Sequence, residues 1–128
     1  MDLIVPEGVG MTEISPQTKK FQKELNAGTS SLVLLSVLSR SKAAMYGYQI
    51  AKLLEESGPD VPIMKHGTLY PVLRSLEENG LLESTVEPSV SGPPRRYYTI
   101  TNDGQSTLLE WLEIWKLTKK YVDANLKG

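Results

Sequence analysis

The sequence predicts a mainly α-helical protein with one small β-hairpin, arranged as a winged helix-turn-helix and followed by a long C-terminal helix. Three observations predict this class. Three helical stretches follow one another within residues 15–79, two strand-like runs flank a turn-rich loop after them, and one further helical pattern fills roughly residues 102–126. A helix-turn-helix unit with a projecting hairpin is a winged helix.

Charge and composition limit the function classes without selecting one. The 128 residues carry 14 Lys and Arg against 15 Asp and Glu, a net charge of −1. This balance argues against a polybasic nucleic-acid-binding protein, but it leaves room for a small DNA reader whose positive charge is local. Apolar residues make up 40%, below the globular norm of about 45–50%, so the core is expected to be small or shared with a partner.

Catalysis and cofactor binding have little support in the composition. Cysteine is absent and His66 is the single histidine, which excludes a disulfide framework, a Cys-rich zinc site and a Cys–His nucleophile. No phosphate-binding loop or nucleophile-elbow motif occurs, and we expect no catalytic residue, metal or cofactor. The apolar run Leu32–Leu35 is too short to span a bilayer, and the first residues lack a signal-peptide pattern, so we expect a cytoplasmic protein.

The first helix is expected to begin near Ser15, after a flexible tail over residues 1–14. Ser15 is a suitable N-cap, and Pro16 suits the first helical turn. The segment Leu32–Leu38 is apolar nearly all round, so this part of the helix should be buried on several sides. A polar connector is expected over Ser39–Ala44.

The second helix is expected from Tyr46 to about Glu56, with Ile50, Leu53 and Leu54 facing inward. It should stop at Ser57-Gly58-Pro59, because Gly followed by Pro ends helices.

The third helix is expected from about Lys65 to Asn79, with Gly80 just past its end. One stripe of this helix should face the core: Leu69, Val72, Leu73 and Leu76. Pro71 lacks a backbone N–H and is tolerable if the helix begins only a few residues earlier, where amides have no intrahelical partner.

The hairpin and the last helix complete the expected elements. Strands are expected over Leu81–Glu87 and Arg95–Ile100, with the turn-rich loop Pro88–Pro94 projecting between them. The last helix, about Asn102–Leu126, should be roughly 37 Å long, with Thr101 or Asn102 as its cap.

The outer face of the third helix is polar and partly basic at its start, and acidic at its end. A recognition helix enters the DNA major groove with its N-terminal half, where phosphates favour positive charge and amide donors. We therefore interpret five side chains as facing the groove: Lys65, His66, Thr68, Tyr70 and Arg74. The alternative is an ordinary amphipathic helix with a solvated face.

The second strand supports the DNA interpretation. Arg95 and Arg96 are adjacent and point to opposite faces of the strand, so one can reach a phosphate or minor groove while the other braces the hairpin. Tyr97 and Tyr98 alternate in the same way, one toward the core and one outward. The alternative is a charged edge that discourages strand pairing between molecules.

Several motifs together resemble the PadR family of bacterial transcriptional regulators. They are Tyr46-Gly47-Tyr48, Gly67-Thr68-Leu69-Tyr70-Pro71-Val72-Leu73, Leu76-Glu77-Glu78-Asn79-Gly80-Leu81 and Arg95-Arg96-Tyr97-Tyr98-Thr99-Ile100-Thr101, within a match from about Gly28 to Gly104. The resemblance implies a winged-helix homodimer that represses transcription from a pseudo-palindromic operator. The single C-terminal helix is similar to the short subgroup, whereas the Ser-Gly-Pro-Pro-Arg-Arg tip of the hairpin is longer than in many members.

The sequence is therefore predicted to divide into the tail 1–14, a winged-helix DNA-binding domain over 15–100 and a dimerisation helix over 101–128. We expect Thr68, Tyr70 and Arg74 to read bases. The expected phosphate contacts are Tyr46, Tyr48, Lys65, Arg95 and Arg96.

The last helix has two apolar faces, more than a small domain can cover. One sector holds Leu108, Trp111, Leu112, Trp115, Val122 and Leu126, and another holds Ile114, Leu117 and Tyr121. Dimerisation would cover them. Trp111 and Trp115 are interpreted first as packing in the dimer core, while the resemblance implies that Trp115 and its symmetry mate form a clamp for a small planar aromatic effector.

Two other functions stay open. A winged helix can bind another protein instead of DNA, with its third helix covered by that partner. An enzyme built around Glu55, Asp60 and His66 has no supporting motif.

Overall fold

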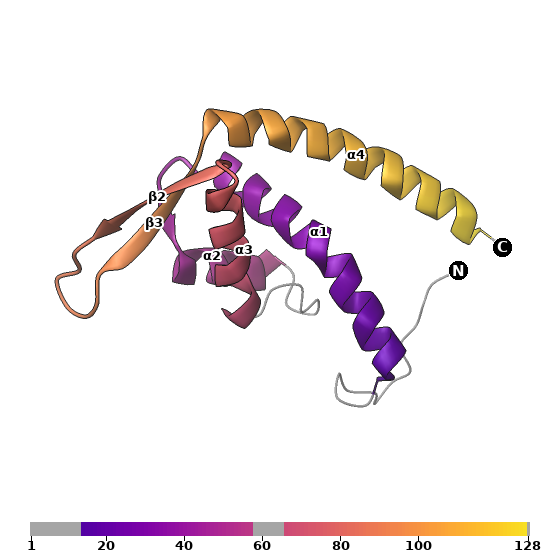
Figure 1. Ribbon diagram of the computed structural model, residues 1–128, viewed down its shortest axis with the longest axis horizontal. Coiled ribbons are helices and arrows are strands. Elements are labelled where there is room, and N and C mark those ends of the chain that lie inside the picture. The colour runs from indigo at the N-terminus through magenta and orange to yellow at the C-terminus, as the bar shows by residue number, and fades with distance from the viewer. Residues whose placement is uncertain (1–13, 58–65, 128) are drawn as a thin grey trace.

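The computed structural model describes residues 14–57 and 66–127. Its elements are α1 (Pro16–Arg40), β1 (Met45–Tyr46), α2 (Gly47–Ser57), α3 (His66–Glu78), β2 (Leu82–Glu87), β3 (Arg95–Ile100) and α4 (Asn102–Leu126). Figure 1 shows α1 and α4 as two long helices that run away from the α2–α3 unit, with the β2–β3 hairpin projecting on the opposite side. The predicted winged-helix class is confirmed. The predicted tail, apart from Ile14, lies outside the described residues.

Local capping residues explain where α1 begins and where α3 ends. The Ser15 side chain accepts a hydrogen bond from the Thr18 amide at 3.2 Å, with Pro16 as the first helical residue. At the end of α3, Gly80 has φ +76°, and the Gly80 and Leu81 amides donate to the carbonyls of Glu77 and Leu76. This end of the helix favours glycine, since residue 80 adopts a left-handed backbone conformation.

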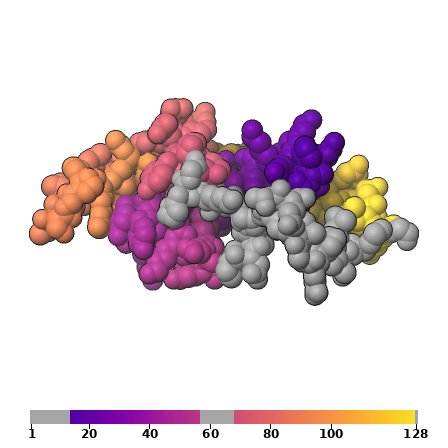
Figure 2. Space-filling model, turned by 90° about the horizontal axis from the view of Figure 1, so that it is seen from below, coloured from indigo at the N-terminus to yellow at the C-terminus, as the bar shows by residue number. Residues whose placement is uncertain are grey.

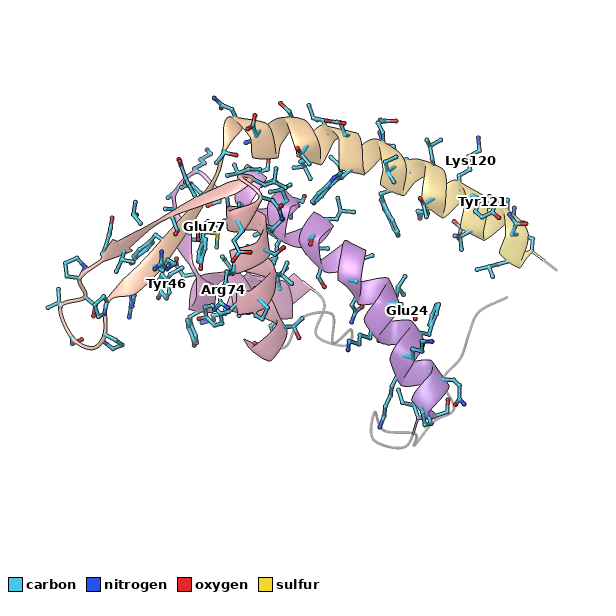
Figure 3. All side chains as sticks on the ribbon, in the orientation of Figure 1. Glu24, Tyr46, Arg74, Glu77, Lys120 and Tyr121 are labelled. Atoms are coloured by element: carbon cyan, nitrogen blue, oxygen red, sulfur yellow. The ribbon has the colours of Figure 1, made fainter. Side chains whose placement is uncertain are left out.

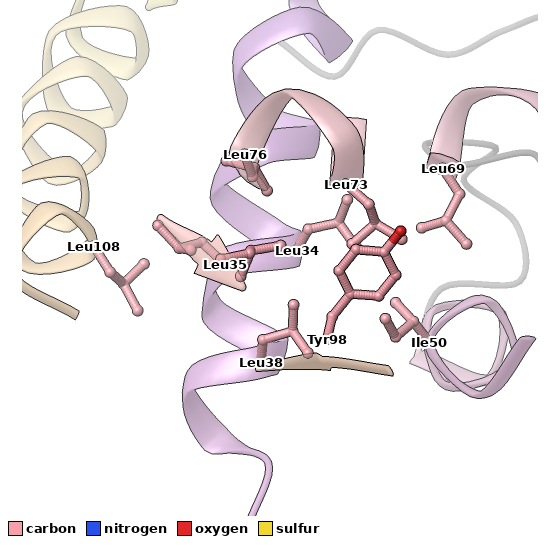
Figure 4. Packing of buried hydrophobic residues seen from close by; sticks show 10 residues of the cluster. Leu34, Leu35, Leu38, Ile50, Leu69, Leu73, Leu76, Tyr98 and Leu108 are labelled. Carbon is pink, nitrogen blue, oxygen red and sulfur yellow. The ribbon is translucent and has the colours of Figure 1, made fainter. Parts of the chain in front are cut away.

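The core lies where α1, α2, α3, the sheet and the start of α4 meet (Figure 4). Its buried members are Leu34, Leu35, Leu38, Ile50, Leu69, Leu73, Leu76, Leu82, Tyr98 and Leu108. Full burial of each such aliphatic side chain contributes about 1.5–3 kcal/mol relative to exposure. Three of the four residues of the predicted α3 stripe are in this core, and the fourth, Val72, is half-buried.

The expectation that Leu53 faces inward is wrong. Leu53 is 43% exposed, whereas Ile50 is buried and Leu54 is half-buried. Ile50 and Leu54 are four residues apart and share one face, whereas Leu53 is rotated about 100° from Leu54. The core therefore covers a narrower part of α2 than the sequence pattern suggested.

A third strand was not predicted. Tyr46 belongs to β1, which pairs antiparallel with β3 through Met45 opposite Tyr98 and Tyr46 opposite Tyr97, in the strand order β1-β3-β2. Two residues are too few to show the alternation that marks a strand. As a consequence α2 begins at Gly47, one residue later than expected, and α1 continues to Arg40, into the expected connector.

The start of α4 is joined to the end of α3. The Thr101 hydroxyl accepts a hydrogen bond from the Gly104 amide at 2.9 Å and donates one to the Gly80 carbonyl at 2.7 Å. The Thr101 amide also donates to the Leu81 carbonyl at 3.1 Å. These contacts fix the direction in which α4 leaves the winged-helix unit.

Neither long helix in the described ranges 14–57 and 66–127 is apolar enough to cross a membrane.

Candidate nucleic-acid interface

The outer face of α3 carries Tyr70 and Arg74 one above the other. Residues four apart lie on the same side of a helix, and Tyr70 is 45% exposed while Arg74 is exposed. Thr68 is also exposed, but it is rotated roughly 160° from Tyr70 around the helix. The three predicted base-reading residues therefore occupy two sides of α3, with Tyr70 and Arg74 together.

Tyr70 lies across the start of α2. A Cβ atom built on Gly47 would be only 2.5 Å from the Tyr70 hydroxyl oxygen. The absence of a side chain at residue 47 therefore leaves the space that the Tyr70 ring occupies. This contact sets Tyr70 beside Tyr46 and Tyr48, which precede and follow the glycine.

A groove of about 430 Å³ joins α3, the start of α2 and the hairpin. It is lined by Tyr46, Tyr48, Tyr70, Ser91, Pro93 and Arg95. Figure 2 shows that α2, α3 and the hairpin lie side by side at one end of the molecule. Four of the predicted DNA-binding residues therefore come together although they are up to 49 residues apart in the chain. Ser91 and Pro93 were not predicted; their only sequence signal was the length of the turn-rich loop.

The two adjacent arginines of β3 are used differently. The Arg95 guanidinium lies over the Tyr46 ring, 4.5 Å from its centroid, and Tyr46 makes an edge contact with Tyr97 at 5.4 Å between ring centroids. A cation over an aromatic face is an attractive arrangement. Arg95 thus rests on the Tyr46 ring and lines the groove, but it stays exposed.

Arg96 points to the other face of the strand. Its Nη1 atom donates to the Ser84 hydroxyl at 2.9 Å, and that hydroxyl donates to Oε2 of Glu77 at 2.5 Å. The expectation that one arginine braces the hairpin is met by this bond. Glu77, expected at the acidic end of the outer face of α3, is instead half-buried against the hairpin.

Of the two tyrosines that follow, Tyr98 is buried and Tyr97 is half-buried. Burial raises the pKa of the Tyr98 phenol above its usual value, the Glu77 carboxylate raises it further, and Arg96 and Arg74 act in the opposite direction. The Tyr98 ring lies between the helices in Figure 4. The Tyr98 phenol is therefore a neutral part of the core, and it lies close enough to the contact between α3 and the hairpin for the charges of Glu77 and Arg96 to act on it.

The remaining residues of the predicted DNA set are at the start of α3. Lys65 lies outside the described residues, and His66 is described only as the first helical residue. Pro71 is the sixth residue of α3, so it lies beyond the first turn, whose amides have no intrahelical partner. Because proline has no N–H, the Gly67 carbonyl lacks the usual donor four residues later.

A second hollow, a groove of about 510 Å³, lies between α1 and α4. Its lining combines residues of both helices: Glu24, Leu25, Gly28, Thr29, Ser31, Leu32, Trp111, Ile114, Trp115 and Thr118. Of the predicted α4 sector, Leu108 is buried and Trp111 and Leu112 are half-buried.

The described residues of one chain leave the distal half of α4 exposed. Trp115 is 40% exposed and Val122 41% exposed, and Ile114, Leu117, Tyr121 and Leu126 are more exposed still. Figure 3 shows Tyr121 on this half of α4, and Glu24 on the first half of α1. On α1, Phe21 and Leu25 are exposed as well. Both long helices therefore present apolar side chains to solvent in the single chain.

Comparison with known proteins gives consistent results. A sequence model described as the transcriptional regulator PadR-like family matches residues 34–110, more than half of the chain. A solved structure of a PadR-family transcriptional regulator from Eggerthella lenta is 33% identical, covers 88% of this chain and 94% of its own, and has a TM-score of 0.72. A transcriptional regulator from Clostridium thermocellum is 30% identical, with coverages of 81% and 99% and the same TM-score of 0.72. An uncharacterized protein from Lysinibacillus sphaericus is 29% identical over 98 residues, 77% of this chain and 87% of that protein.

Proposed function

Because the chain belongs to the PadR-like family of transcriptional regulators, we propose that it binds a pseudo-palindromic DNA operator as a homodimer and represses transcription there. The observation that supports this best is the groove in which Tyr46, Tyr48, Tyr70 and Arg95 meet. These side chains come from β1, α2, α3 and β3, so the helix and the hairpin present one continuous surface. A DNA duplex docked on a winged helix contacts both elements.

The proposed contacts divide into residues that read bases and residues that contact phosphates. Thr68, Tyr70 and Arg74 on α3 read base edges in the major groove, where arginine pairs well with guanine. Five other members of the set hold the phosphate backbone and fix the register: Tyr46, Tyr48, Lys65, Arg95 and Arg96. His66 is proposed to face the groove. Tyrosine hydroxyls outnumber cations among the described groove residues, so hydrogen bonds carry a large share of this contact.

The homodimer is supported by the exposed apolar residues of α1 and α4. Exposed apolar side chains that cluster on two helices mark an interaction surface. A two-fold copy would cover Trp115 and Val122 and would place two α3 helices about one DNA turn, roughly 34 Å, apart.

A small planar aromatic effector is proposed to bind where α4 meets its mate, lined by Trp111, Leu112, Trp115 and Val122. The α1–α4 groove beside Trp111 and Trp115 supports this site. We expect planar aromatic cations or phenols to quench tryptophan fluorescence of the dimer and to release it from DNA. Trp115→Phe should remove most of the quenching while Trp111 still reports folding. No spectral change across a panel of such compounds would contradict the effector site.

Replacing Arg74 with alanine tests the DNA surface. Each phosphate neutralised by a cation contributes roughly 0.9 to the slope of log affinity against log salt. We expect Arg74→Ala to weaken DNA binding about tenfold, equivalent to ~1.4 kcal/mol. If Arg74 also neutralises a phosphate, the slope should fall by about one. Fluorescence anisotropy with a labelled duplex over a salt series gives both values.

The matched control is Lys116→Ala, which removes one positive charge from an exposed site on α4. It should leave affinity and slope unchanged. Equal behaviour of the two variants would remove Arg74 from the interface. A folded wild-type protein without affinity for any duplex at low salt would instead favour a winged helix that binds another protein.

A further inference from the structure

The end of α3 is connected to the hairpin by a chain of three polar side chains. Glu77 Oε2 accepts the Ser84 hydroxyl, and Ser84 Oγ accepts Nη1 of Arg96. Figure 3 places Glu77 where α3 passes the hairpin, and Arg74 on the same helix. The chain links one helix with both strands of the hairpin.

The hydrogen bonds of this connection are stronger than those between neutral groups. Both of its hydrogen bonds involve a charged group, one a carboxylate and the other a guanidinium, and such bonds are shorter and stronger than neutral ones. Ser84 acts as acceptor for one partner and donor for the other, so its hydroxyl hydrogen has one orientation. Glu77 and Ser84 are half-buried, which limits competition from water.

The hairpin needs such a connection because, among the described residues, no third strand pairs with its outer part. β1 pairs only with Tyr97 and Tyr98, so Arg95 and Arg96 pair with β2 alone. Two-stranded ribbons twist more than wider sheets and are only marginally stable by themselves. Arg96 lies just beyond the last residue that β1 supports, at the point where the ribbon could pivot.

We propose that Glu77 is a positioning residue for DNA binding: through Ser84 and Arg96 it holds the hairpin at a set angle to α3. The inference rests on the proposed function, since the angle matters only if α3 and the hairpin engage one duplex together. The Glu77–Ser84–Arg96 connection places a carboxylate on the DNA-reading helix, where its charge alone would oppose DNA binding. Its contribution to DNA binding is the fixed angle between the hairpin and α3.

Electrostatics and positioning predict opposite changes in DNA affinity when the Glu77 charge is removed. Removing a negative charge near phosphates favours DNA binding if only electrostatics acts. Removing the Glu77 carboxylate weakens DNA binding if that group positions the hairpin. Glu78 is the matched control, because it is adjacent on α3 and exposed.

The experiment compares Glu77→Gln, Glu78→Gln and Ser84→Ala with the wild type on a duplex selected by the wild-type protein. We expect Glu77→Gln and Ser84→Ala each to raise Kd about tenfold, while Glu78→Gln binds as well as the wild type or better. Urea unfolding of each variant reports its folded fraction. Ser84→Ala retains both charges, so it tests the connection even if Glu77→Gln unfolds.

A double-mutant cycle separates positioning from a general loss of structure. If Glu77 acts through Arg96, then Glu77→Gln combined with Arg96→Ala should bind no more weakly than Arg96→Ala alone. Independent, additive losses, or a Glu77→Gln variant that binds as tightly as Glu78→Gln, would overturn the positioning role while leaving DNA binding intact. A wild-type protein that selects no duplex would overturn the proposed function itself.

Discussion

Replacing Val122 with aspartate is expected to convert the proposed dimer into monomers and to weaken binding to the proposed operator by about a hundredfold or more, because two linked half-sites gain roughly 10²–10⁴ over one. Val122 is 41% exposed in the single chain and lies far from the core, so the monomer should stay folded. A buried charge without a partner is costly, which is the reason that the dimer should fail. Light scattering and anisotropy with the operator duplex measure the two effects.

Ala124→Asp is the matched control for this variant. It adds the same charge to the same helix at an exposed residue, but two positions along, hence about 200° around the helix axis. The control should remain a dimer with wild-type affinity. If Val122→Asp also remains a dimer, the proposed interface on this face of α4 is wrong.

Replacing Gly104 with valine is expected to cost about 3 kcal/mol of unfolding free energy, because it overpacks a tight junction. Even a methyl group at residue 104 would overlap the Leu81 carbonyl oxygen and lie 2.6 Å from Cγ1 of Ile100. That carbonyl accepts the Thr101 amide, so it cannot move without breaking the link between α3 and α4. The midpoint of urea unfolding, followed by circular dichroism, measures the loss.

Ser106→Ala, at an exposed residue of the same helical turn, should change the unfolding free energy by less than about 0.5 kcal/mol. The tight-junction account would be wrong if Gly104→Val unfolded at the same urea concentration as this control. A variant that folds normally but loses the dimer would place the effect of Gly104 on the direction of α4 instead.

Features encoded by neighbouring residues could be predicted from the sequence. Ser15 caps α1, Thr101 caps α4 and Gly80 closes α3, because each depends on residues within one turn. The core stripe of α3 follows from helical periodicity, and Tyr98 and Tyr97 differ in burial because strand residues alternate. These elements were sufficient to indicate the winged helix.

Features that depend on long-range contacts could not be predicted. β1 exists because Met45 and Tyr46 meet β3, some 50 residues later. The two arginines were correctly expected to diverge, but only the fold shows that Arg95 rests on Tyr46 and that Arg96 reaches Ser84. Glu77 was expected at the end of the outer face of α3, because nothing near it in sequence indicates a contact with the hairpin.

The net charge of −1 is an average that hides the arrangement of the charges. Arg74 and Arg95 lie on the proposed DNA surface, whereas the Glu77 carboxylate is turned into the hairpin. With few cations among the described interface residues, non-specific affinity should be modest, and the preference for a single sequence should persist at physiological salt.

Selection of duplexes from a random library by the purified protein at physiological salt tests the central claim most directly. The proposed function predicts enrichment of one pseudo-palindromic sequence, with half-sites about 10 base pairs apart and two protein chains bound per duplex. Failure to enrich any sequence, together with no retention of DNA at low salt, would contradict it.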